Sequence, residues 1–117
     1  MAKLSTHVLD TSRGTAAAGI AIELHRLDGA GRSLVATATT NADGRTDTPL
    51  LQSDRLEPGV YELSFHAGEY LRNAGHALTN PPFLDVVVIR VGIADPDGHY
   101  HVPLLLSPYG YSTYRGT

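Results

Sequence analysis

The stretch LDVVVIRVGIADPDGHYHVPLLL, residues 84–106, decides the fold expected for this chain. Residues 84–93 form a β-branched apolar run, which predicts a strand buried on both faces at the centre of the core. The following Asp95-Pro96-Asp97-Gly98 has the strongest turn chemistry in the sequence, because proline presets the first corner and glycine permits a positive φ. We therefore expect a hairpin that joins this core strand to a second strand at residues 99–106.

The second strand carries two histidines on one face. Alternation along residues 99–106 places His99 and His101 together, and it turns four apolar side chains to the opposite face: Tyr100, Val102, Leu104 and Leu106. The histidine pair is thus expected on a rigid strand whose other side is in the core. Ser107-Pro108-Tyr109-Gly110 turns the chain again, and residues 111–117 are expected to return as a last short strand.

The rest of the chain shows the same period-two pattern. It predicts further strands at residues 5–10, 19–27, 33–40 and 60–65, and His7 shares one face of the first of these with Ser5 and Leu9. Residues 66–74 are the one helix candidate, with Gly75 as its stop. Without crossover helices an all-parallel sheet is excluded. These features predict an all-β sandwich with Greek-key-like connections.

Composition limits the possible functions. A chain of 117 residues and 12.5 kDa fits a single domain over residues 1–117. The absence of cysteine excludes disulfides, a thiol nucleophile and sulfur-based zinc sites. A net charge of -3 with a single lysine, Lys3, gives no basic field for nucleic acid or an acidic membrane surface. Because no membrane span or secretory signal is visible, the cytoplasm is the expected compartment.

Several histidines and one arginine are the candidates for chemistry. If the fold gathers His7, His99 and His101, two imidazoles could act as general acid and base, while Arg45, at the turn Asn41 to Asp47, could bind a planar polar substrate and its developing negative charge. Three imidazoles could instead bind zinc, although a nearby guanidinium would repel the cation. In a third interpretation the histidines merely line a polar crevice or a subunit contact. No Gly-x-Ser-x-Gly elbow or phosphate loop is present.

Motifs at both ends and in the middle carry a resemblance to a known family. They are Leu4-Ser-Thr-His-Val-Leu-Asp10, Gly44-Arg-Thr-Asp47, His99-Tyr-His-Val-Pro-Leu-Leu-Leu-Ser-Pro108 and Tyr111-Ser-Thr-Tyr-Arg-Gly-Thr117. Together, in this order, they resemble the 5-hydroxyisourate hydrolases, the transthyretin-like enzymes of urate breakdown. The terminal Tyr-Arg-Gly-Ser of that family is its most specific motif, and here it reads Tyr-Arg-Gly-Thr.

The resemblance implies a fold, an assembly and a reaction. The implied fold is a transthyretin-like sandwich of two four-stranded antiparallel sheets with one short helix. The implied assembly is a homotetramer, a dimer of dimers with active sites where the dimers meet. The implied reaction is hydrolysis of 5-hydroxyisourate to 2-oxo-4-hydroxy-4-carboxy-5-ureidoimidazoline, without a cofactor or a metal.

The resemblance also implies roles for particular residues. His7 and His101 match the family's catalytic histidines, Arg45 matches the arginine that binds and polarises the substrate, and His99 would lie in the pocket or just behind it. The tail that would line the site comprises Tyr114, Arg115, Gly116 and Thr117. Threonine at the last position keeps the hydroxyl of the family's serine but adds a methyl group.

A carrier is the main alternative. The same fold also serves transthyretin-like proteins that bind a small aromatic ligand, such as a thyroid hormone, in the equivalent channel, and architecture alone does not separate the two functions. A carrier of bulky apolar ligands would have little use for His7, Arg45 and His101 together with the polar tail.

Overall fold

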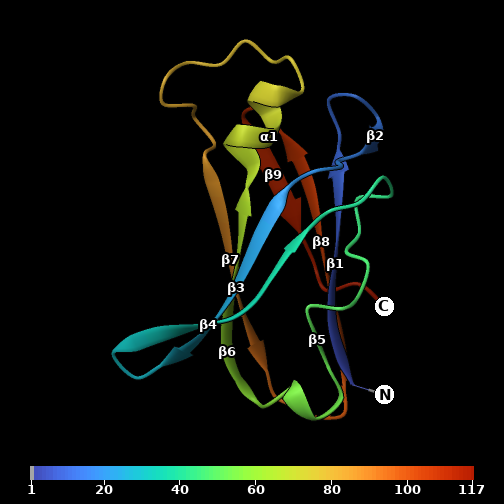
Figure 1. The fold of residues 1–117 in the computed structure, drawn as a ribbon, viewed down its shortest axis with the longest axis vertical. Helices are drawn as coiled ribbons and strands as arrows, with labels where there is room; N and C mark the ends of the chain where they lie inside the picture. The colour runs from blue at the N-terminus through green and yellow to red at the C-terminus, as the bar shows by residue number, and fades with distance from the viewer. Residues whose placement is uncertain (1) are drawn as a thin grey trace.

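Two β-sheets pack face to face and enclose the core (Figure 1). The structure is a computed structural model and describes residues 2–117. One sheet contains β1 (Lys3–Asp10), β2 (Thr15–Ala16), β5 (Leu51–Gln52), β8 (His99–Ser107) and β9 (Gly110–Thr113). The other contains β3 (Ala21–Asp28), β4 (Gly31–Thr39), β6 (Gly59–His66) and β7 (Val86–Ile93). The helix α1 (Ala67–Asn73) follows β6, and a single 3₁₀ turn, η1 (Ser53–Arg55), follows β5.

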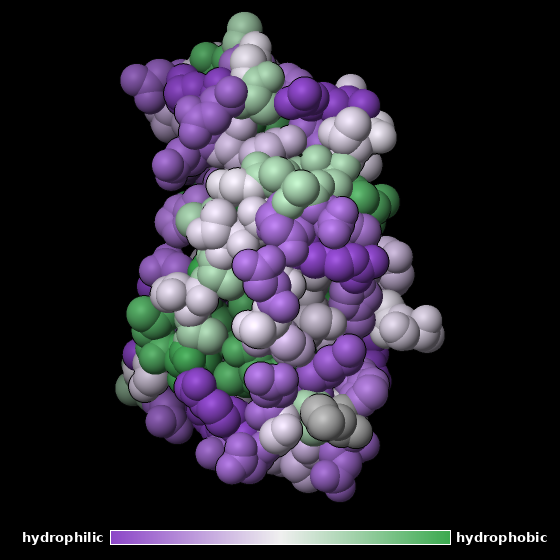
Figure 2. Space-filling view, turned by 45° about the vertical axis from the view of Figure 1, so that its right-hand side comes forward, coloured by the Kyte–Doolittle hydropathy of each residue, from purple (hydrophilic) through white to green (hydrophobic). Residues whose placement is uncertain are grey.

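Side chains along each strand alternate between the core and the outside, as the sequence predicts. In β6, Tyr61, Leu63 and Phe65 are at most 1% exposed, because every second side chain faces the other sheet. In β8, Leu104 and Leu106 are likewise fully buried. The surface is accordingly mainly hydrophilic on the face seen in Figure 2, with a hydrophobic patch towards its lower left. The predicted all-β sandwich with one short helix is confirmed.

The strand at residues 84–93 is not the central strand that its composition suggests. β7 lies at the edge of its sheet, whose strand order is β4-β3-β6-β7. Val87 and Ile89 are buried, whereas Val86 and Val88 are 43% and 44% exposed. The prediction of burial on both faces is therefore wrong: β-branched residues favour any strand, and no layer formed by residues 2–117 covers the outer face of this one.

The predicted hairpin across Asp95 to Gly98 is also wrong. The turn forms, with the Gly98 N–H donating to the Asp95 carbonyl at 3.1 Å, but it carries the chain from β7 in one sheet to β8 in the other. The Tyr100 hydroxyl accepts hydrogen bonds from the N–H groups of Ala94 and Asp95, which holds this crossing in place. Turn chemistry fixes the reversal of the chain, and it leaves open which strand each arm then pairs with.

β8 pairs instead with β1, in parallel, and with β9, antiparallel. The expectation of two four-stranded antiparallel sheets is thus wrong in two details: one pair of strands is parallel, and one sheet has five strands because the short β2 and β5 both pair with β1. In the parallel pair Ser5 lies opposite His101 and Lys3 opposite His99. The first and the penultimate strands of the chain therefore lie side by side.

The helix and the tail complete the fold. α1 occupies most of the predicted segment, and Gly75, at φ 95°, follows its end. The last strand, β9, ends at Thr113, three residues after it begins, and the tail then crosses back to form an isolated bridge between Gly116 and His101. Among the described residues no helix has the length and apolar character needed to span a membrane.

Candidate active site

The outward face of the β1–β8 pair carries the predicted histidines. In β1 the side chains of Leu4, Thr6 and Val8 are buried, so Ser5 and His7 point away from the core. In the parallel register His101 lies opposite Ser5, and His7 lies two residues further along β1 on the same face. The structure therefore brings the two predicted catalytic histidines together from opposite ends of the chain.

A tight loop brings Arg45 to the same place. The Asn41 Oδ1 atom accepts hydrogen bonds from the N–H groups of Asp43 at 2.9 Å and Arg45 at 3.2 Å, which fixes the turn. The Val8 N–H donates to the Gly44 carbonyl at 2.8 Å, and the backbone of Arg45 forms an isolated antiparallel β-bridge with that of His7. Gly44 is required here, since its φ is +75° and an added Cβ would lie 2.3 Å from the Val8 carbonyl oxygen.

The loop also orients the His7 ring. Its Nε2 atom lies 2.9 Å from the Asp43 carbonyl oxygen. A carbonyl oxygen only accepts, so Nε2 must carry the hydrogen. In the neutral ring Nδ1 then keeps a lone pair and can accept a proton.

His101 is held on two sides. Its Nδ1 atom lies 2.8 Å from the Ser5 hydroxyl oxygen. On the other side is the tail: the Gly116 N–H donates to the His101 carbonyl at 2.7 Å, and a Cβ on Gly116 would lie 2.7 Å from His101 Cδ2. Glycine therefore allows the tail to lie directly against the imidazole.

Arg45, Ser5 and His101 border a surface depression of about 270 Å³, whereas His7, on the same face of β1, is not one of its lining residues. The depression is lined by Lys3, Ser5, Arg45, His99, Tyr100, His101 and Thr117. The lining is rich in hydrogen-bond donors and in positive or potentially positive groups, which suits a small polar molecule with acceptor oxygens.

The electrostatic environment keeps His101 neutral. Burial lowers the pKa of His101 below its ordinary value of 6.5, and the charges of Arg45 and Lys3, together with that of His7 when it is protonated, lower it further. At neutral pH this imidazole is therefore uncharged and can donate from one nitrogen while it accepts at the other.

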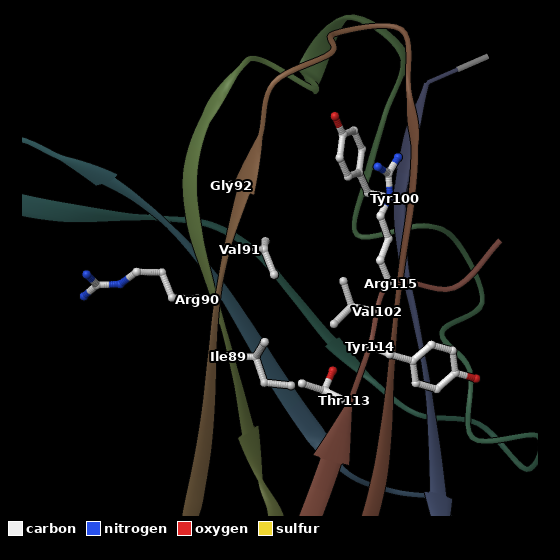
Figure 3. Close-up of a pocket in the computed structure, with 9 residues that line it drawn as sticks. All are labelled: Ile89, Arg90, Val91, Gly92, Tyr100, Val102, Thr113, Tyr114 and Arg115. Atoms are coloured by element: carbon white, nitrogen blue, oxygen red, sulfur yellow. The ribbon is translucent and has the colours of Figure 1, made fainter.

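Two residues of the tail are directed elsewhere. The Arg115 guanidinium carbon lies 4.3 Å from the centre of the Tyr100 ring, and its Nη2 donates to the His99 carbonyl at 3.1 Å. Arg115 and Tyr114 line a second cavity of about 320 Å³ between β7 and the β8–β9 hairpin (Figure 3). Of the tail residues predicted to line the site, Thr117 lines the depression and Gly116 packs against His101.

Sequence reasoning assigned no role to two residues that line the depression, Lys3 and Ser5. Both lie on the His7 face of β1 at a spacing of two, so the alternation of that strand was the signal that could have found them. Three histidines lie elsewhere: His66 contacts Glu23, His76 contacts Ser12, and the Nδ1 atom of His25 is buried without a partner among the described residues. Across residues 2–117 no group of three His, Cys, Asp or Glu side chains is arranged to hold a metal ion.

The sandwich and the histidine–arginine site together define a transthyretin-like protein with a polar site. Residues 4–116 match the model of the HIUase/Transthyretin family. A curated relative, 5-hydroxyisourate hydrolase 2 of Rhizobium meliloti, is 58% identical over 115 residues, which cover 98% of this chain and 96% of the relative. The chain belongs to the HIUase/transthyretin family.

Solved structures of related proteins have the same fold. An (S)-allantoin synthase superposes with a TM-score of 0.93 at 44% identity; the match covers 99% of this chain but only 44% of that longer protein. The 5-hydroxyisourate hydrolase of Klebsiella pneumoniae gives a TM-score of 0.82 at 34% identity, with both chains fully covered. A sea bream transthyretin in complex with thyroxine gives 0.86 at 30% identity, covering 98% of this chain and 95% of that one.

Proposed function

We propose that this protein is a 5-hydroxyisourate hydrolase, an enzyme that opens the six-membered ring of its substrate at an amide bond. The observation that carries the proposal is the meeting of His7, Arg45 and His101 on the outward face of the β1–β8 pair. The identity of 58% to a curated hydrolase of nearly equal length supports the same activity.

His7 has the geometry of the general base. The Asp43 carbonyl occupies Nε2, so the free lone pair of Nδ1 is available to take a proton from water. The water oxygen then bonds to the carbonyl carbon, the bond from that carbon to the ring nitrogen breaks, and the nitrogen receives the proton that His7 took from the water, which returns His7 to its neutral form. The second hydrogen of the water is released to solvent when the new carboxyl group ionises. The product carries the new carboxylate and the freed N–H group.

Arg45 and His101 act on the substrate. The Arg45 guanidinium can bind a planar ring through two parallel hydrogen bonds and stabilise the negative charge that develops on the attacked carbonyl oxygen. Neutral His101 contributes a hydrogen-bonding group at the same depression. His99 and Thr117 complete its wall, and no step of this mechanism calls for a metal or a cofactor.

We further propose the homotetramer that the sequence resemblance implies, with sites where two dimers meet. The open position of the depression on the outer face of its sheet supports a lid supplied by another subunit. Residues 1–117 as a single domain and a cytoplasmic location remain predictions from the sequence.

A thyroxine-type carrier is the second candidate, because the sea bream transthyretin shares the fold. The lining argues against it. A depression with two imidazoles, a guanidinium and a lysine does not complement a bulky apolar ligand.

The first test is the ultraviolet decay of 5-hydroxyisourate, freshly generated from urate by a purified oxidase. The protein is compared with His101→Asn and with the wild type in a chelator. Chelator-resistant acceleration that His101→Asn loses would support the histidine mechanism. A rate equal to spontaneous decay would refute the hydrolase and favour the carrier, which thyroxine binding would then test.

A further inference from the structure

We infer that Ser5 is a positioning residue for His101: its hydroxyl donates to Nδ1 and holds the ring so that Nε2 presents its hydrogen to the depression. The inference rests on the proposed function, since it assigns a role within that reaction. It concerns a residue for which the sequence patterns gave no role.

The backbone fixes the pair. Ser5 and His101 are direct neighbours in the parallel register of β1 and β8, and their side chains leave the same face of the sheet. β1 is an interior strand, with β8 on one side and β5, the Asn41–Arg45 loop and β2 along the other. The distance of 2.8 Å between Ser5 Oγ and His101 Nδ1 is therefore set by paired backbone on both sides of Ser5.

The ring has only one edge left for substrate. Nδ1 is occupied by Ser5, and Cδ2 faces Gly116 at a distance that leaves no room for a methyl group. No hydrogen bond to Nε2 is formed by any residue between 2 and 117, while His101 lines the depression. Nε2 is therefore the nitrogen that can meet the substrate.

The direction of the hydrogen bond between Ser5 and His101 follows from which partners the Ser5 hydroxyl has. Within the described chain, His101 Nδ1 is the only hydrogen-bond partner of the half-buried Ser5 side chain. Donation from Ser5 pairs the O–H group, whereas acceptance from an Nδ1–H group would leave the O–H without a protein acceptor. Donation requires the lone pair on Nδ1, so in neutral His101 the hydrogen is on Nε2.

His7 and His101 then present opposite hydrogen-bonding groups to the site, one an acceptor and the other a donor. His7 offers a lone pair at Nδ1, because its Nε2–H is given to Asp43. His101 offers a hydrogen at Nε2, because its lone pair is given to Ser5. The lowered pKa of His101 keeps it in this neutral form at physiological pH. One imidazole accepts a proton from water, while the other, which is neutral, donates a hydrogen bond to a substrate oxygen or nitrogen.

The tautomer is measured directly by long-range ¹H–¹⁵N NMR of the imidazole rings in the ligand-free protein, with His101→Asn used to assign the signals. The wild type and Ser5→Thr are expected to show the Nε2–H form of His101, and Ser5→Ala a mixture of both tautomers. An Nδ1–H form in the wild type, or an unchanged tautomer in Ser5→Ala, would overturn the inference.

Kinetics supply the second readout. Ser5→Ala is expected to lower kcat about tenfold, equivalent to about 1.4 kcal/mol, with KM changed less than twofold, and Ser5→Thr is expected to restore most of the rate. Ser112→Ala, on the exposed strand β9, is the matched control. A Ser5→Ala rate equal to that of Ser112→Ala would contradict the inference. If the wild type has no hydrolase activity but the tautomer follows Ser5, the proposed function fails and the positioning contact stands.

Discussion

The main-chain N–H of Gly116 donates a hydrogen bond of 2.7 Å to the carbonyl oxygen of His101, so the end of the chain is fastened to the strand that carries the candidate catalytic histidine. The contact is close enough that an added Cβ would lie 2.7 Å from the imidazole. The tail therefore forms one wall of the site and limits where the ring of His101 can lie.

Gly116→Ala is expected to lower kcat/KM at least tenfold, because the methyl group must displace either the tail or the imidazole. The melting temperature should change little, since the tail is largely exposed. Gly110→Ala, whose Cβ would meet nothing closer than 3.8 Å, is the control. Equal activity of the two variants would show that the contact has no role in turnover.

Asn41→Ala is expected to raise KM about tenfold, because the Arg45 loop loses the side-chain oxygen that binds two of its N–H groups. Asp47→Ala removes only the partner of the Asn41 amide nitrogen and should be much milder. Steady-state kinetics of both variants test the point, and a larger effect from Asp47→Ala would contradict it.

Lys3→Gln is expected to raise the pKa of His101, because it removes one of the positive charges that lower it. An NMR titration of the His101 ring should place the wild-type pKa below 6.5 and that of the variant closer to it. Arg32→Gln, in the β3–β4 hairpin, should leave the titration unchanged. A wild-type pKa at or above 6.5 would refute the description of this site.

The same pKa shift has a consequence for stability. Because the folded state binds the His101 proton more weakly than the unfolded state, the free energy of unfolding should fall as pH drops from the unfolded value near 6.5 through the folded pKa. His101→Asn should lose this part of the slope. Urea unfolding at a series of pH values measures it, and an identical slope in the variant would argue against the shift.

Asp10→Asn is expected to lower the free energy of unfolding by about 2 kcal/mol at pH 7. Asp10 is fully buried and accepts a hydrogen bond of 2.8 Å from Tyr70, which joins α1 to the end of β1, and another from Ser12 in the turn that follows. Exposed Glu69→Gln is the control. A loss no larger than the control's would show that the contact is not stabilising.

The effect of Asp10→Asn should depend on pH. Burial by itself would raise the pKa of Asp10, but hydrogen bonds from Ser12 and Tyr70 outweigh it and hold the pKa below 3.8. The stabilisation is therefore complete above about pH 3.8 and is lost as pH falls through the folded value. Burial, together with the hydrogen bond to Asp10 and its charge, raises the pKa of Tyr70 to about 12, so the Tyr70 hydroxyl stays a donor over the pH range of this test.

Local patterns predicted the strands and the candidate residues, and they did not predict the pairing. Alternation predicts that His101 faces away from the core and that His7 shares a face with Ser5, and the structure agrees with both. The run at residues 84–93 was assigned to the centre because apolar strand residues look alike whether or not a second layer covers them. Whether the turn at Asp95 joins strands of one sheet or of two depends on distant contacts, chiefly those between β1 and β8.

The tail shows the same limit. The motif predicts that all four tail residues line the site. In the structure the hydrogen bond from Gly116 to His101 leaves Thr117 at the depression, while Arg115 stacks on Tyr100. The Asp10–Tyr70 contact had no sequence signal, because its members are 60 residues apart and each has an ordinary local context.

The parallel pairing of β1 with β8 also bears on how the protein folds. Ser5 and His101 are separated by 96 residues, so the contact closes a loop that contains most of the chain. Closing so long a loop contributes to slow folding, because its entropic cost is offset by favourable contacts only once the intervening strands are in place. A partly folded molecule can thus contain every strand of the β4-β3-β6-β7 sheet and still have no site, so recovery of activity during refolding would report completion of the whole structure.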